Sequence, residues 1–203
     1  KGFEVVIEPI FFVEKITLPY FKDAKAIILT SANAAENVLN YPKDIKIFAV
    51  GKKTAQILEN QGYSNISYPK IANAENLLDL IVENYDINDN LILYFCANEI
   101  TLDFERELKN KGFNAKKIIS YTINWQQNFS QDFLQKKYKN FDYILFYSQN
   151  SAKNFYNLAK KHNLLEFFLP SKLICLSDKI ADILREKGFK NFGNFNDFFN
   201  FFN

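Results

Sequence analysis

Four short polar segments contain the residue types that could bind an anion. They read TSAN, VGKKT, YSQN and LSDK, and each follows an apolar run and opens a helical pattern. A helix N-terminus presents free N–H groups and a positive dipole end, which suit phosphate or carboxylate. Lys53 and Lys179 add charge in two of these segments. The alternative is structural, because Ser31 and Ser148 are typical helix N-cap residues.

Groups that commonly do covalent or acid–base chemistry are scarce. The single histidine, His162, ends a helical pattern, and we interpret it as a surface residue because no second histidine could share a metal with it. Cys96 lies at a strand end, but without a neighbouring histidine it is interpreted as a small buried residue. Tyr121 could move a proton, or it could be a packed tyrosine. The sequence has no P-loop, GxGxxG or GxSxG motif.

Seven short apolar runs of β-forming residues alternate with helical patterns. The runs cover residues 4–7, 26–30, 46–50, 90–95, 116–123, 143–148 and 172–176. Helical patterns between them include residues 53–62, 74–85 and 181–188. This alternation predicts βαβ units and therefore parallel sheets. Three helical patterns run into a glycine followed by an aromatic residue, where a left-handed residue ends a helix.

An internal repeat predicts two domains of one architecture. Residues 28–38 align with residues 145–155, so that Ser31 matches Ser148 and Asn37 matches Asn154. Residues 49–63 align with residues 175–189 in the same order and with similar spacing. Polar positions match as well as apolar ones, which favours duplication. Chance similarity between α/β units is the alternative.

The composition is that of a globular protein. The chain has 203 residues, of which 48% are hydrophobic and 24% charged, enough for one large or two small domains. The sequence contains no apolar run of about 18 residues, so it predicts no membrane-spanning helix. The net charge is +2 and like charges are not clustered, so we expect no nucleic-acid or membrane partner. Two distant cysteines indicate a reduced, cytoplasmic protein.

Taken in order, these segments resemble the uroporphyrinogen-III synthase family over nearly the whole chain. TSAN is similar to the family's T-S-x-x-A segment, and VGKKTA to its V-G-x-x-T-A segment. YSQNS is similar to the S-P-S-x segment, and SYTI to the V-Y-x-T segment. Each motif is weak alone, whereas their order and spacing are specific.

The resemblance implies an α/β fold of two flavodoxin-like (HemD-like) domains with parallel sheets, joined by a two-stranded β-ladder. The crossing strands would be residues 5–16 and 116–126. Residues 13–123 would form the inserted domain, and residues 1–12 with 124–203 the split domain. The opening KGF would then end a helix, so we expect that the N-terminal strand and helix of the split domain are missing. In a sheet of order 2-1-3-4-5 that strand is central.

The resemblance also implies an activity. Family members cyclise hydroxymethylbilane, a linear tetrapyrrole with eight carboxylates, to uroporphyrinogen III with loss of water and inversion of ring D. Such an enzyme is a lyase of heme biosynthesis, and we expect a monomer that needs no metal or other cofactor. Tyr121 would assist departure of the hydroxyl group. Residues facing the substrate, between the domains, would be Ser31, Asn33, Lys53, Thr54, Asn98, Ser148, Asn150, Ser177 and Lys179.

Some positions depart from the family pattern, and other functions stay open. The last loop lacks the family's G-x-T-T-A pattern, so Lys179 would replace a threonine contact by charge. Ala97 stands where the family has glycine. A two-domain solute-binding protein that clamps an anion without chemistry would share this architecture. A regulatory pair of flavodoxin-like domains would need an aspartate in an acidic cluster at a strand end, and the strand ends show none.

Overall fold

The computed structural model describes residue 2 and residues 4–87, 90–136 and 138–200. The chain divides into two compact units. Unit 1 comprises Lys1–Phe12 and Asn124–Asn203, and unit 2 comprises Val13–Ile123. No helix within the described residues is long and apolar enough to cross a membrane.

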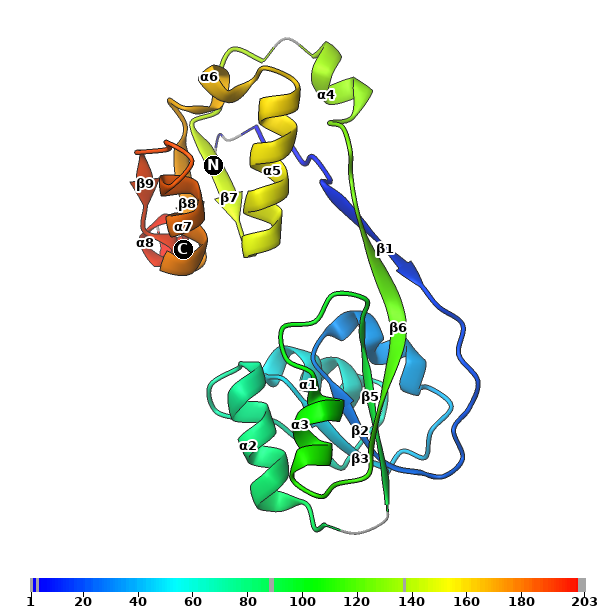
Figure 1. Cartoon of the computed structure of the whole chain (residues 1–203). Helices are drawn as coiled ribbons and strands as arrows, with labels where there is room; N and C mark the ends of the chain where they lie inside the picture. The colour runs from blue at the N-terminus through cyan, green and yellow to red at the C-terminus, as the bar shows by residue number, and fades with distance from the viewer. Residues whose placement is uncertain (1, 3, 88–89, 137, 201–203) are drawn as a thin grey trace. The chain divides into compact units, whose positions relative to one another are not determined.

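Unit 2 is built on a largely parallel sheet (Figure 1). Its strands are β2 (Ala24–Leu29), β3 (Lys46–Ala49), β4 (Ile66–Ser67), β5 (Leu91–Ala97) and β6 (Ala115–Trp125), and β1 (Phe11–Lys15) pairs with β6. The spatial order is β1-β6-β5-β2-β3-β4, with β2 parallel to both β3 and β5. The strand order therefore reverses direction between β2 and β5, which is where open α/β sheets bind ligands.

Helices cover both faces of this sheet because its strands are apolar on both sides. The 3₁₀ helix η1 (Ala32–Val38) and α1 (Lys52–Asn60) pack on the face that contains Ile27 and Leu29. The opposite face contains Ala26 and Ile28, and α2 (Ala74–Asn84) and α3 (Phe104–Asn110) pack there. Two buried clusters on either side of one sheet hold the carboxyl ends of its strands in place.

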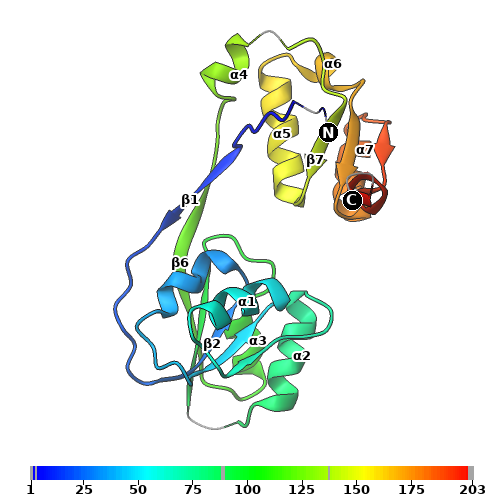
Figure 2. The ribbon, with the colours of Figure 1, turned by 180° about the vertical axis from the view of Figure 1, so that it is seen from behind.

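Unit 1 has a smaller parallel sheet (Figure 2). Its strands β7 (Tyr143–Phe146), β8 (Lys172–Cys175) and β9 (Phe192–Gly193) are ordered β7-β8-β9. The helices are α4 (Gln131–Gln135), α5 (Gln149–Lys161), α6 (Leu165–Phe168), α7 (Asp178–Arg185) and α8 (Phe195–Asn200). Buried phenylalanines at positions 129, 133, 146, 155, 168 and 189 make up much of the core.

The predicted helix ends at glycine are confirmed. Gly62, Gly112 and Gly188 have φ of 91°, 88° and 96°, the left-handed region that favours glycine. After each glycine an aromatic N–H donates to the carbonyl of a leucine five residues back, in the pairs Tyr63–Leu58, Phe113–Leu108 and Phe189–Leu184. All six of these side chains are buried. The chain thus uses one stop signal three times, with a hydrophobic contact that closes each helix.

The predicted strand at residues 4–7 is wrong. Residues 4–9 have no strand structure, and β1 begins only at Phe11. Val6 and Ile10 are partly buried against the core of unit 1, whereas Val5 and Ile7 are 77% and 83% exposed, so burial accounts for only part of the apolar run. A strand needs a hydrogen-bonded neighbour, and Pro9 also lacks an N–H to donate. The short strands β4 and β9 were missed, and the predicted helix end at residues 1–3 rests on two residues outside the described ranges.

The chain passes between the units within β1 and again within β6. Ile10 accepts a hydrogen bond from the Gln126 amide at 2.9 Å, and the Ile16 amide donates to Ser120 at 3.0 Å. As residue numbers rise along β1 they fall along β6, so this pair is antiparallel. The bounds of β1 are shorter than the predicted crossing strand, whereas those of β6 lie close to the prediction.

Candidate functional site

In unit 2, the strand ends predicted to bind an anion lie at the carboxyl edge of the sheet. Thr30 and Ser31 follow β2, Gly51 follows β3, and Asn98 follows β5. Beneath this edge the Thr30 hydroxyl shares a 3.4 Å hydrogen bond with the phenol of Tyr94. Burial raises the pKa of Tyr94 well above its usual range, so the phenol stays neutral. The pair therefore links β2 to β5 at the point where the strand order reverses, with Tyr94 itself buried.

Ser31 and Ser148 occupy equivalent positions in their units. Both are helix N-caps in extended conformation, with φ of −152° and −148°. The Ser31 hydroxyl accepts from the Asn33 amide at 3.2 Å, and the Ser148 hydroxyl accepts from the Ser151 amide at 3.1 Å. The capping role is thus present at both sites. A capping hydroxyl that accepts a hydrogen bond can still donate its own proton to a bound carboxylate.

The second pair of repeated segments, VGKKT and LSDK, lies at the starts of α1 and α7. Gly51 and Ser177 are the N-caps, and neither makes a side-chain capping bond. A Cβ atom at Gly51 would lie 2.7 Å from that of Ala72, so the close approach of these two segments requires glycine. Lys53 and Lys179 are exposed in the first turn of their helices, and neither forms an ion pair with a carboxylate among the described residues. Two ammonium groups therefore stand at corresponding helix starts.

The remaining predicted binding residues differ in how accessible they are. Thr54 is buried beneath the start of α1, whereas Asn33 and Asn150 are exposed. Asn98 has a structural task, since its side-chain carbonyl accepts from the Ile123 amide at 2.8 Å. Its own backbone amide donates to the Tyr121 carbonyl at 3.2 Å. Asn98 thus holds β6 on both sides of residue 122, so its side-chain oxygen positions the strand.

Tyr121 lies on β6 next to an irregularity in the β5–β6 pairing. The register steps from Cys96 opposite Ile119 to Ala97 opposite Tyr121, so Ser120 is the extra residue. The Ser120 hydroxyl donates to the Cys96 carbonyl at 3.2 Å. Bulges re-aim a side chain and are common near active sites. Tyr121 is 4% exposed and packs in the core of unit 2, so its ring also has a packing role.

Cys96 and His162 do not offer catalytic groups. Cys96 is 1% exposed, and burial raises the pKa of its thiol to about 11, so the thiol is protonated at neutral pH. This agrees with its interpretation as a small buried residue. The interpretation of His162 as a surface residue is wrong in part. It caps the end of α5, but its ring packs against Phe129 and its Nε2 atom is buried.

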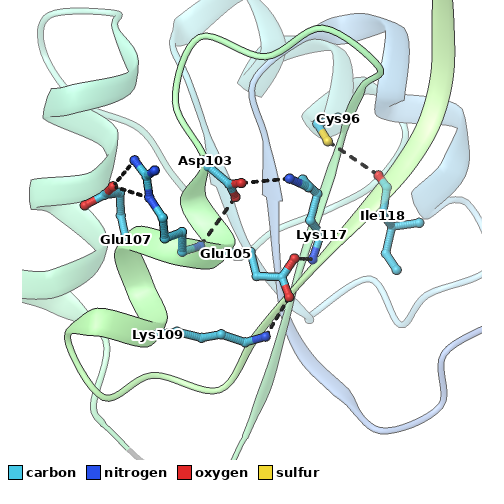
Figure 3. Close-up of polar contacts among 8 residues, drawn as sticks. Cys96, Asp103, Glu105, Glu107, Lys109, Lys117 and Ile118 are labelled. Carbon is cyan, nitrogen blue, oxygen red and sulfur yellow. Dashed lines mark hydrogen bonds and ion pairs between the residues drawn. The ribbon is translucent and has the colours of Figure 1, made fainter.

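A network of ion pairs ties α3 to β6 behind the bulge (Figure 3). Lys117 donates from Nζ to Asp103 at 2.7 Å and from its amide to Glu105 at 3.1 Å, and Glu105 also pairs with Lys109 at 2.6 Å. The hydrogen bond from Lys117 holds the pKa of Asp103 below its usual value. The sequence alone did not single out these residues. The N-cap aspartate was a readable signal for α3, whereas its pairing with Lys117 was not.

Comparison with known proteins identifies the family. The family model described as "HEM4: Uroporphyrinogen-III synthase HemD" matches residues 1–192. The chain belongs to the uroporphyrinogen-III synthase family. Members of this family are enzymes of tetrapyrrole synthesis that act on a small-molecule tetrapyrrole. The porphyrin and heme biosynthesis implied by the sequence resemblance is therefore supported.

Solved uroporphyrinogen-III synthases share the fold. The Helicobacter pylori enzyme, titled uroporphyrinogen-III synthetase, has a TM-score of 0.65 and 21% identity over 90% of this chain and 83% of its own. A mutant Thermus thermophilus enzyme has a TM-score of 0.56 and 16% identity, over 91% and 80%. The uncharacterized protein RP474 of Rickettsia prowazekii is 27% identical, over 78% of this chain and 71% of its own.

Seen as a member of the uroporphyrinogen-III synthase family, the chain carries its candidate residues in two groups. Unit 2 carries Ser31, Asn33, Lys53, Thr54 and Asn98 at or near the carboxyl edge of its sheet. Unit 1 carries Ser148, Asn150, Ser177 and Lys179 at the corresponding edge of its own sheet. Most residues of both groups follow parallel strands and lie at helix starts, whereas Asn98 follows β5 without beginning a helix.

Proposed function

We propose that this chain is a uroporphyrinogen-III synthase, a lyase that converts hydroxymethylbilane to uroporphyrinogen III. The observation that carries the proposal is the family match over residues 1–192. The repeated strand ends support it, because two sets of helix N-termini, hydroxyls and ammonium groups suit a substrate with eight carboxylates. The competing idea of a binding protein without catalysis finds no support among the proteins that the chain resembles.

The reaction asks more of positioning than of proton transfer. The substrate loses its hydroxyl group as water after protonation, which leaves an electrophilic azafulvene cation. Attack by the substituted carbon of ring D gives a spiro intermediate, and opening and reclosure of that ring yield the inverted isomer with loss of a ring proton. Unassisted closure gives the uninverted isomer. Donors that bend the chain therefore decide the product, and orientation supplies much of the rate.

In this proposal Tyr121 assists departure of the hydroxyl group. It is the phenol next to the bulge at the carboxyl end of β5, and two hydrogen bonds, one through the Asn98 backbone amide and one through its side-chain oxygen, hold its strand. A phenol hydroxyl can donate the proton that the departing hydroxyl needs. Lys53 and Lys179 balance substrate carboxylates, and the capping serines contribute hydroxyl protons. Asn98 acts through the position of β6.

We further propose that the two units are the domains of a duplicated enzyme, residues 13–123 and residues 1–12 with 124–203. A strand and a helix from outside the described residues would complete unit 1. In the repeat β7 corresponds to β2, which lies between β3 and β5. Within the described strands β7 pairs only with β8, so one of its edges is open. A structure of a longer chain that leaves this edge of β7 unpaired would contradict the proposal.

The deciding experiment is a product assay. Freshly prepared hydroxymethylbilane is incubated with the protein, the products are oxidised, and the porphyrin isomers are separated. We expect isomer III to dominate with protein and isomer I to dominate without it. Formation of isomer I alone, together with measurable binding of the substrate, would reject catalysis and favour the binding protein.

A further inference from the structure

Two asparagines that match in the internal repeat make the same kind of contact. Asn37, in η1, donates from its side-chain amide to the Ile16 carbonyl at 3.4 Å. Asn154, in α5, donates to the Ile10 carbonyl at 2.9 Å and to the Gln126 carbonyl at 3.2 Å. In each unit the first helix after the repeated serine therefore contacts the backbone at one end of the β1–β6 pair. Each contact lies within a single unit.

The same backbone positions end the β1–β6 pair. The Ile10 carbonyl accepts from the Gln126 amide, and the Ile16 amide donates to the Ser120 carbonyl. Residues 10 and 16 flank β1 and correspond to residue 120, within β6, and residue 126, just after it, so the two bonds exchange under a local twofold relation. The same arrangement of helix, asparagine and strand end therefore occurs twice, once in each unit.

We propose that Asn37 and Asn154 are paired positioning residues that fix the two ends of the β1–β6 pair to their units. The hydrogen bond from Asn37 to Ile16 fixes the position of β6, the strand that carries Tyr121, because the Ile16 amide is bonded to the carbonyl of Ser120, the residue before Tyr121. This part rests on the proposed function. Asn154 binds carbonyls of both strands and so ties β1 to β6 directly.

The chemistry of the contact requires an amide. A primary amide carries two N–H donors, which is what Asn154 needs for two carbonyls. Aspartate of the same size would place an acceptor against acceptors, and leucine would leave the carbonyls without that donor. Both asparagines are half-buried, so water replaces the lost donor only in part. Leucine at either position therefore removes the contact while it keeps the side-chain volume.

Hydrogen exchange of single amides tests the structural half of the proposal. In Asn154→Leu we expect the Gln126 amide to exchange about three- to tenfold faster than in wild type. In Asn37→Leu we expect the same increase at the Ile16 amide. Increases of this size follow when hydrogen bonds of ordinary strength are removed. Amides of β5 should not change. Asn191→Leu and Asn84→Leu are matched controls, since each asparagine donates to one backbone carbonyl away from these strands. Unchanged exchange at both amides would overturn the proposal.

Steady-state kinetics test the functional half. We expect Asn37→Leu to lower kcat about three- to tenfold. Its KM should stay within about twofold of wild type, because the donors at the strand ends are unchanged. Asn37→Gln should restore part of the lost kcat. Faster exchange with unchanged kcat in a folded variant would reject the positioning role. Should leucine prevent folding, Asn37→Ser and Asn154→Ser replace it in both measurements. If the wild type forms no isomer III, the proposed function fails, and the exchange data still decide whether the asparagines hold the strands.

Discussion

Tyr121 combines a buried ring with a hydroxyl group that we assign to catalysis. Its ring packs in the core of unit 2, and the strand around it is held by Asn98 and Ser120. Phenylalanine keeps the ring and removes the hydroxyl. We expect Tyr121→Phe to lower kcat about ten- to hundredfold, at or below the usual contribution of one general acid. Turnover and isomer ratio are measured together.

The isomer ratio separates positioning from proton transfer. Tyr121→Phe should still give isomer III, because in the proposed mechanism many donors, and not this hydroxyl alone, set the bent pose of the substrate. Complete loss of activity in a folded variant would argue against such a distributed mechanism. A rate equal to wild type would leave Tyr121 as a packing residue.

Asp103 should support the fold in a way that depends on pH. The hydrogen bond from Lys117 holds its pKa below the ordinary value of 3.8. A depressed folded-state pKa stabilises the fold above the unfolded-state pKa, and the stabilisation disappears as pH falls through the folded-state pKa. Asparagine at position 103 can still accept the N-cap hydrogen bond from the Arg106 amide, but it removes the negative charge. We expect Asp103→Asn to lower the free energy of unfolding at pH 7 by up to about 1 kcal/mol.

Urea unfolding at several pH values measures this difference. The stabilities of Asp103→Asn and wild type should converge as pH falls below 3.8. Glu107→Gln is the control, because among the described residues Glu107 forms its ion pair with its neighbour Arg106, which is largely exposed. A difference for Asp103→Asn that stays constant down to low pH would show that the charge is not its cause.

At the level of elements, the repeated helix end makes a clear prediction. Gly188 has φ of 96°, and no heavy atom lies within 4 Å of the position that a Cβ atom would occupy. An alanine there suffers only the left-handed backbone, which costs roughly 1–2 kcal/mol. We expect Gly188→Ala to lower the free energy of unfolding by about that amount, measured by chemical denaturation.

Asparagine at the same position provides the comparison. Asn tolerates the left-handed region better than Ala, so Gly188→Asn should be less destabilising than Gly188→Ala. Equal losses for the two variants would mean that the backbone conformation does not explain the effect. Gly51 is different, because its φ is −178° and a Cβ atom there would meet Ala72.

At the level of the whole molecule, the internal repeat of the sequence places one exposed lysine at an equivalent helix start in each unit. If Lys53 and Lys179 both balance substrate carboxylates, reversing either charge should weaken binding. We expect Lys53→Glu and Lys179→Glu each to raise KM about tenfold at low salt, with a smaller effect at high salt because exposed charges are screened. Kinetics at two ionic strengths measure this.

Lys160→Glu is the matched control for the lysine variants. Lys160 is exposed at the opposite end of α5 from its N-terminus, so the same change in net charge occurs away from the strand ends. Similar KM values for Lys160→Glu and Lys179→Glu would point to net charge alone. Unchanged KM for both Lys53→Glu and Lys179→Glu would remove the lysines from the binding site.

The sequence by itself determined the local elements and their repetition. The spacing of apolar residues and the runs of β-branched residues predicted six of the strands and three helices, because these signals lie in residues only a few positions apart. Glycine followed by an aromatic residue predicted helix ends that the φ values bear out. The matched serines predicted two equivalent helix starts, since a capping hydroxyl reaches amides two or three residues ahead.

Tertiary structure alone decided the partners that are distant along the chain. The oxygen of Asn98 was predicted to face substrate, yet it binds the Ile123 amide on the neighbouring strand. Lys117 pairs with Asp103 only because β6 lies beside the loop that starts α3. Residues 4–7 look like a strand, but a strand forms only where another strand supplies hydrogen bonds. Local patterns set which element a segment prefers, and the packing of elements sets which polar groups remain for a ligand.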